Sequence, residues 1–155
     1  MSETSRAKSL WFMSGHVTVH LAMADNAGGI SITEHLLPAG FGPPYHVHHN
    51  EDETCYVLDG EVRCKQPDRV LHAKPGDVVH LARGIPHGFK VVSLMGARLL
   101  IVSDGGFEAM LRAASQVASS VSLPEQQLDP TPEMQAKLAE ICAANGIQLL
   151  GPPID

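Results

Sequence analysis

The sequence lacks an excess of positive charge, and this absence bears first on the choice of partner. Its 155 residues include 11 Lys and Arg against 17 Asp and Glu, which gives a formal net charge of −6 with histidine neutral. A nucleic-acid-binding domain is typically basic and gathers its Lys and Arg on one face. No such basic patch occurs in the sequence, so we expect no nucleic acid among the partners.

Long apolar runs are also missing. The apolar segment nearest the start, Leu10-Trp11-Phe12-Met13, is short, whereas a membrane-spanning helix needs about 20 apolar residues and a signal-peptide core about 7 to 15. We therefore expect a cytoplasmic protein with no membrane partner.

Cysteine is scarce as well. Three cysteines do not supply the disulfide framework of a small secreted domain. We expect Cys55 and Cys64 to act as small buried apolar residues, with an oxidisable pair as the alternative. The remaining composition, 44% hydrophobic and 18% charged, is typical of a soluble globular protein, and the length suits a single domain.

The first two-thirds of the chain has the pattern of many short β-strands. Apolar and polar residues alternate in segments that turn residues such as Lys74-Pro75-Gly76 separate, which indicates a β-sandwich or barrel. The clearest alternating segments are 17–21, 30–37, 77–81 and 97–102.

One dipeptide predicts how two of these strands meet. Asp59-Gly60 is the signal of a two-residue type I′ hairpin, and it lies between two strand-like runs. Such a turn would place Cys55 opposite Cys64, with both thiols facing the interior.

Helical periodicity begins only after Gly105-Gly106. A first helix would carry Phe107, Met110, Leu111 and Ala114 on one stripe. A second helix would begin at Pro132 with Thr131 as its N-cap and end at Asn145-Gly146. We expect these helices to cover the flank of the β-structure or a partner subunit and not to carry chemistry.

Histidine and carboxylate spacing points to a metal site. Successive side chains of a strand face opposite sides, so His46 and His48 project together from one face. A short loop then returns Glu53 at the head of the next strand, and His87 is the candidate for a fourth ligand. Imidazole and carboxylate together suit a divalent transition metal.

Other roles for these residues stay open at this point. Glu53 could bind the metal, act beside it as a general base, or be solvated, and Glu51 and Asp52 are nearby substitutes. His46 and His48 could also form a polar pair on a solvated face. The scattered His35, like His72 and His80, is expected at the surface or hydrogen-bonded and not at the site.

The same residues resemble the two motifs of the cupin superfamily. The first motif reads Gly40, His46, His48, Glu53 and Gly60 with no departure. The second is matched at Gly76, Gly84 and His87, while Ala82 and Val91 stand where proline and asparagine are usual. The resemblance covers about residues 15–102 and is strongest to small single-domain bacterial cupins likened to quercetin dioxygenases.

The resemblance implies an all-β double-stranded β-helix, or jelly-roll, barrel with the two helices at its C-terminus. We divide the chain into a flexible N-terminus at 1–9, a cupin β-barrel at 10–104 and a C-terminal helical extension at 105–155. It also implies one divalent metal held by His46, His48, Glu53 and His87, with Fe or Mn favoured and Ni, Co, Cu or Zn as alternatives. A homodimer is expected on the same ground and because the apolar strand Leu10 to Met13 would need cover.

The function that follows is a metal-dependent dioxygenase acting on a small aromatic or enol substrate, with Glu53 as the catalytic carboxylate. A small-molecule-binding cupin without activity and a metal-dependent isomerase or lyase are the alternatives. The residues that alternate in step with the ligands along the strands are mainly apolar, which indicates a mainly apolar pocket. The residues expected to form it are Tyr45, Cys55, Val57, Val62, Cys64 and Phe89.

Overall fold

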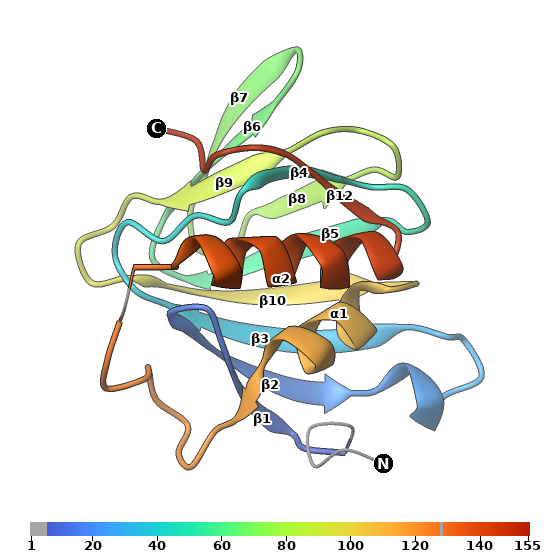
Figure 1. Cartoon of the computed structure of the whole chain (residues 1–155). Helices are drawn as coiled ribbons and strands as arrows, with labels where there is room; N and C mark the ends of the chain where they lie inside the picture. The colour runs from blue at the N-terminus through green and yellow to red at the C-terminus, as the bar shows by residue number, and fades with distance from the viewer. Residues whose placement is uncertain (1–5, 128) are drawn as a thin grey trace.

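A computed structural model of the protein describes residues 6–127 and 129–155 (Figure 1). Among these residues, most of the chain's regular structure is antiparallel β-sheet, and short strands lie in a large sheet and two smaller ones. The large sheet has the order β11 (Gln116–Val117), β1 (Ser9–Phe12), β2 (Gly15–Leu21), β3 (Ser31–Leu37), β10 (Ala97–Ser103), β5 (Glu53–Asp59), β8 (Val78–Leu81).

The two smaller sheets lie together in the upper part of the view (Figure 1). One has the order β7 (Arg69–Ala73), β6 (Val62–Gln66), β9 (Gly88–Val91), and the other pairs β12 (Ile147–Gly151) with β4 (Tyr45–His48). Besides a short 3-10 helix, Met23–Asp25, the described helices are α1 (Phe107–Ala114) and α2 (Pro132–Ala144). The predicted all-β jelly-roll barrel with two C-terminal helices is confirmed.

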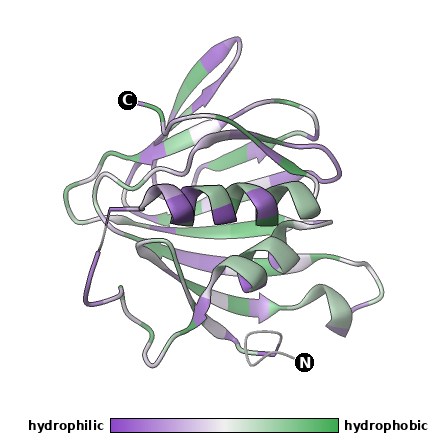
Figure 2. Cartoon of the chain, viewed as in Figure 1, coloured by the Kyte–Doolittle hydropathy of each residue, from purple (hydrophilic) through white to green (hydrophobic). Residues whose placement is uncertain are grey.

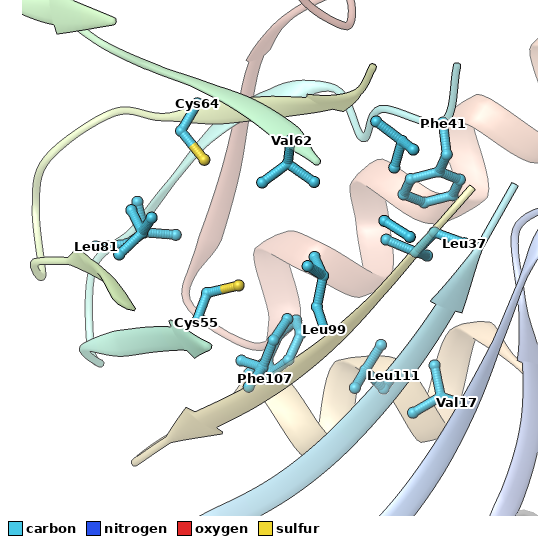
Figure 3. Close-up of a cluster of buried hydrophobic side chains, with 14 of the residues drawn as sticks. Val17, Leu37, Phe41, Cys55, Val62, Cys64, Leu81, Leu99, Phe107 and Leu111 are labelled. Carbon is cyan, nitrogen blue, oxygen red and sulfur yellow. The ribbon is translucent and has the colours of Figure 1, made fainter. Parts of the chain in front are cut away.

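The core is built from the side chains at every second position of the strands, which face inward. In β3 and β10, which pair along their whole length, every second residue is buried. Leu99, which is 1% exposed, is one of these residues, and burying a leucine side chain contributes about 1.5 to 3 kcal/mol. Figure 3 shows Leu99 and the cysteines Cys55 and Cys64 with other side chains from both sets of strands and α1, all within one interior cluster.

The predicted hairpin between β5 and β6 is wrong. Strand β5 pairs with β10 and β8, and β6 pairs with β7 and β9, so Cys55 and Cys64 are not cross-strand partners. The chain crosses from one sheet to the other at Gly60, which has φ +75° and packs so closely on Gly96 that a Cβ would lie 2.3 Å from the Gly96 oxygen. A turn dipeptide fixes the local bend but not which strand becomes the neighbour.

The two helices form where the sequence predicts them. Phe107, Met110 and Leu111 of α1 are buried. The Thr131 hydroxyl caps α2 by accepting a 3.2 Å hydrogen bond from the Met134 N–H, and Asn145 follows its last residue. Figure 2 shows hydrophilic and hydrophobic residues interspersed along α2. Within 6–127 and 129–155, no helix is long and apolar enough to cross a membrane.

The C-terminal extension also contributes strands. Its β11 pairs with β1 and its β12 pairs with β4, which carries two of the candidate ligands. At the other end, residues 1–5 of the segment expected to be flexible lie outside the described residues. The Lys8 carbonyl of that segment accepts a 2.8 Å hydrogen bond from the Val19 N–H.

Candidate metal centre

Three candidate ligands are brought together by one pair of adjacent backbones. His46 and His48 lie two residues apart on β4 and so share a face. His87 lies beside His46, and the two exchange backbone hydrogen bonds of 2.8 and 3.0 Å. The backbone therefore fixes the relative positions of the three imidazoles before any side chain is considered.

Glu53 reaches the same point from the opposite sheet. It begins β5, where it is paired with Ser103 on one side and Leu81 on the other. The ligand atoms of His46, His48, Glu53 and His87 all lie within 4.8 Å of one another. Glu53 Oε2 is 3.0 Å from His48 Nε2 and 3.4 Å from His87 Nε2.

The ring nitrogens on the far side of each imidazole are hydrogen-bonded to the protein. His46 Nδ1 is 2.6 Å from the Pro44 carbonyl oxygen, and His87 Nδ1 is 3.1 Å from that of Ile85. His48 Nδ1 is 2.6 Å from a carboxylate oxygen of Glu51. An Nδ1–H that donates to such an acceptor directs Nε2 toward a metal, which is the usual arrangement of histidine ligands.

The donors at the centre fit a cation. The Nε2 atoms of His48 and His87 are buried and, although near Glu53, have no hydrogen bond of acceptable geometry to any residue that the structure describes. Buried polar atoms without a partner are rare in native proteins and often mark an ion site. Imidazole nitrogen and carboxylate oxygen are the mixed donor set of divalent transition metals. The residues present therefore fit one such metal.

Electrostatics at the centre also favour positive charge. Burial lowers the pKa of His48, but the Glu53 and Glu51 carboxylates outweigh it and raise that pKa to about 10. Burial likewise opposes ionisation of Glu53, yet His48 and His87 hold the pKa of its carboxyl well below the usual range. His46 differs, because burial and the neighbouring His87 and His48 lower its pKa to about 4.

Glu51 has a role that the spacing argument did not assign to it. Its side chain is fully buried, with one carboxylate oxygen on His48 and the other accepting a 2.8 Å hydrogen bond from the Phe107 N–H at the start of α1. Gly105 packs against it, since a Cβ there would lie 2.7 Å from a Glu51 oxygen. Its position three residues after His48 is the sequence signal that could have indicated this contact.

The metal centre lies in the wall of a cavity of about 80 Å³. Of the residues predicted to form the pocket, Cys55, Val62, Cys64 and Phe89 line this cavity. Val57 does not, because it is fully buried in the core farther along β5. The predicted Tyr45 also lies outside the lining.

Strand alternation explains the position of Tyr45. It precedes His46 on β4, so its side chain leaves the opposite face. The ring packs against Gly88, and the hydroxyl donates a 3.3 Å hydrogen bond to the Pro86 carbonyl.

The C-terminal extension forms part of the cavity wall, and this contribution was not expected. Its lining residues come from α1, α2 and β12: Phe107, Met110, Leu138, Cys142, Ile147 and Leu149. His35, expected at the surface or hydrogen-bonded, is 5% exposed, hydrogen-bonded and part of the lining. Apolar periodicity predicted the helices but could not show which interior they face.

The cysteines of the cavity wall are thiols. Cys55, Cys64 and Cys142 are all buried, and none is in a disulfide. Burial raises the pKa of Cys55 above its usual range and that of Cys64 and Cys142 to about 11. Since the thiolate is the form that binds metals, these thiols do not compete with the imidazoles at neutral pH.

Known proteins similar to this chain share its fold. A cupin domain family model matches residues 32–103, while no curated protein matches the chain. A predicted oxalate decarboxylase from Thermotoga maritima has 20% identity and a TM-score of 0.56, over 67% of this chain and 97% of that one. At such identity the likeness shows the fold alone.

Two further solved structures give the same result. A sugar phosphate isomerase from Silicibacter pomeroyi has 17% identity and a TM-score of 0.55, over 67% of this chain and 74% of that one. The Cnp3 cupin domain of Schizosaccharomyces pombe has 15% identity and a TM-score of 0.54, over 61% and 66%. With both motifs, the family model and the fold in agreement, the chain carries a cupin domain, which the family model places at residues 32–103.

Proposed function

We propose that the protein is a metal-dependent dioxygenase that acts on a small aromatic or enol substrate inside its cavity. The observation that supports this most is the convergence of His46, His48, Glu53 and His87 in the wall of a mainly apolar cavity. A buried metal site open to an apolar space suits an organic substrate that is oxidised away from bulk water.

The four residues would hold one divalent metal, with Fe or Mn favoured. The Glu53 carboxylate offsets one of its two positive charges, and three neutral imidazoles leave the rest. When bound, such a metal supplies a Lewis acid and, where it is redox-active, a means for O₂ and substrate to react.

Glu53 is the proposed catalytic residue. Its carboxylate is 4% exposed and adjoins the cavity, so a substrate hydroxyl at the centre lies within its reach. When a substrate hydroxyl binds, Glu53 would leave the metal and accept the proton of that enol or phenol hydroxyl, which leaves the substrate as an oxygen anion. The apolar wall keeps water from competing for that proton.

The cavity wall also limits the substrate class. Neither Arg nor Lys is among the described residues that line it, and phosphate groups are typically bound by such cations or by helix N-termini. A sugar phosphate or oxalate, the ligands that the names of two structural neighbours suggest, would therefore lack a charge partner apart from the metal centre. A small apolar molecule with a hydroxyl group fits better.

The test is oxygen consumption by protein loaded with Fe²⁺ or Mn²⁺ under air, across a panel of flavonols, catechols and small enols. We expect uptake with at least one substrate and its loss in His46→Ala, whose Nδ1 partner is a carbonyl and not a buried charge. His80→Ala is the matched control, because His80 is exposed and lies outside the cavity.

Each other result points to a different class of protein. Turnover of a panel member without O₂ would identify an isomerase or lyase. Thermal stabilisation by a ligand without turnover, and without sensitivity to chelator, would identify a binding protein. The absence of O₂ uptake across the whole panel would contradict the oxygenase proposal.

A further inference from the structure

His35 is the polar side chain of the cavity that the metal centre does not use. Of the described residues that line the cavity, those outside the metal centre are apolar or cysteine except His35. It lies on β3, in the face of the large sheet that points inward, and is 5% exposed. Its presence in an apolar wall requires an explanation, because a buried polar group costs free energy unless it is hydrogen-bonded.

Only one of the two ring nitrogens of His35 is hydrogen-bonded to a residue that the structure describes. Its Nε2 is 2.9 Å from the Thr33 hydroxyl oxygen, and Thr33 is fully buried. Its Nδ1 has no partner among the residues that the structure describes. One ring nitrogen is thus fixed by the sheet, while the other is left for a group inside the cavity.

Aromatic contacts place His35 close to the metal centre. Its ring stacks on Phe107, with centroids 5.9 Å apart and planes inclined by 21°. The same Phe107 ring meets His48 edge-on, with centroids 5.8 Å apart. His35 is therefore one aromatic ring away from a metal ligand, and a small molecule in the cavity can contact both.

The charge state of His35 indicates which polar group it would bind. Burial lowers its pKa to about 4, against a smaller opposite effect of Glu53, so the imidazole is neutral at pH 7. A neutral imidazole nitrogen either donates or accepts one hydrogen bond, depending on its tautomer. Such a group selects a hydroxyl or carbonyl and gives no advantage to a second anionic group.

We propose that His35 is a specificity-determining residue that hydrogen-bonds a neutral hydroxyl or carbonyl of the substrate. The ligand is then a small, mainly apolar molecule with two polar ends, one at the metal centre and one at His35. This inference rests on the proposed function, because it takes the metal centre as the site of the first polar end.

The experiment compares probes that differ by one hydroxyl group. Protein loaded with Co²⁺ is titrated with benzoate and with its 2-, 3- and 4-hydroxy derivatives, and dissociation constants are read from the visible spectrum of the cobalt. Since a neutral hydrogen bond is worth up to about 1.5 kcal/mol, we expect one hydroxybenzoate to bind about tenfold more tightly than benzoate.

His35→Phe should abolish that preference between hydroxybenzoate and benzoate, because phenylalanine keeps the stacking on Phe107 and loses the hydrogen bond. His16→Phe is the matched control. His16 is 1% exposed on the neighbouring β2 and is hydrogen-bonded to the Ser9 hydroxyl, but it lies outside the cavity lining. The control should keep the preference.

His35→Gln is the second variant, for the case that His35→Phe does not fold, and it too should lower the preference because its amide cannot occupy the position of Nδ1. A preference that survives in a folded His35 variant, or its absence from the unchanged protein, would overturn the role of His35 alone. Failure of the unchanged protein to bind Co²⁺ would overturn the proposed function and this inference together.

Discussion

The ligand histidines are oriented through the ring nitrogens that face away from the metal centre. Two of these nitrogens meet backbone carbonyls, of Pro44 and Ile85, whereas His48 meets the carboxylate of Glu51. A carboxylate is the stronger acceptor, because a hydrogen bond to a charged group is worth about 1.5 to 3 kcal/mol. Glu51 therefore fixes the orientation of His48 and increases its basicity toward a metal.

Glu51→Gln tests this positioning role with little change in shape. The amide loses the negative charge that faces His48, so we expect metal affinity to fall by about 10 to 100-fold, the usual effect of removing such a partner. The measurement is a competition titration of Co²⁺ or Zn²⁺ between the protein and a chromophoric chelator.

Glu61→Gln is the matched control for that titration. The Glu61 side chain is exposed, and this substitution changes the net charge by the same amount. We expect its metal affinity to equal that of the unchanged protein. Equal affinities for the folded Glu51 variant and this control would show that Glu51 supports the fold without acting on the metal centre.

At the scale of elements, two glycines of the first motif have the same backbone conformation but different surroundings. Gly40 has φ +76° and Gly60 has φ +75°, a region that costs other residues about 1 to 2 kcal/mol. A Cβ at Gly40 would meet nothing within 4 Å, while one at Gly60 would lie 2.3 Å from the Gly96 oxygen and 2.8 Å from the Ala97 Cα. Only Gly60 is needed for close contact between segments.

Gly60→Ala should therefore destabilise the fold more than Gly40→Ala does. Both variants carry the backbone cost, but Gly60→Ala also pushes β5 and the start of β10 apart, and such overpacking costs about 1 to 3 kcal/mol. Urea unfolding followed by circular dichroism measures the difference, with Gly40→Ala as the control. Equal losses of unfolding free energy would show that the crossing at Gly60 can open without cost.

Gly60 also shows how far the sequence determines these elements. Strand alternation and one short loop predicted that His46, His48 and Glu53 converge, whereas His87 was a candidate fourth ligand that the resemblance to the second cupin motif implied. The Asp59-Gly60 signal predicted the bend but not the partner strands, because pairing depends on residues distant in the chain. The same holds for Glu51, whose contact with Phe107 spans 56 residues.

At the scale of the whole molecule, the metal centre depends on segments from most of the chain. Its ligands come from β4, from the head of β5 and from the residue before β9, while α1, α2 and β12 line the cavity. Backbone pairing joins His48 to Ile147 and His46 to Leu149 of β12. An unfolded chain cannot hold these groups together, so a metal binds the folded state preferentially.

Metal binding should therefore raise the unfolding temperature of the whole domain. A ligand at about 100 times its dissociation constant adds about 2.7 kcal/mol, and for a domain of this size each kcal/mol raises Tm by about 2 to 4 °C. We expect a gain of roughly 5 to 10 °C in calorimetry of chelator-treated protein to which Co²⁺ or Mn²⁺ is added back.

His87→Ala should show no such gain, and His72→Ala, which alters an exposed histidine, should show all of it. Because protons compete with the metal for the imidazoles, the gain must shrink as pH falls, and a gain that is independent of pH or retained in His87→Ala would place the metal elsewhere on the protein.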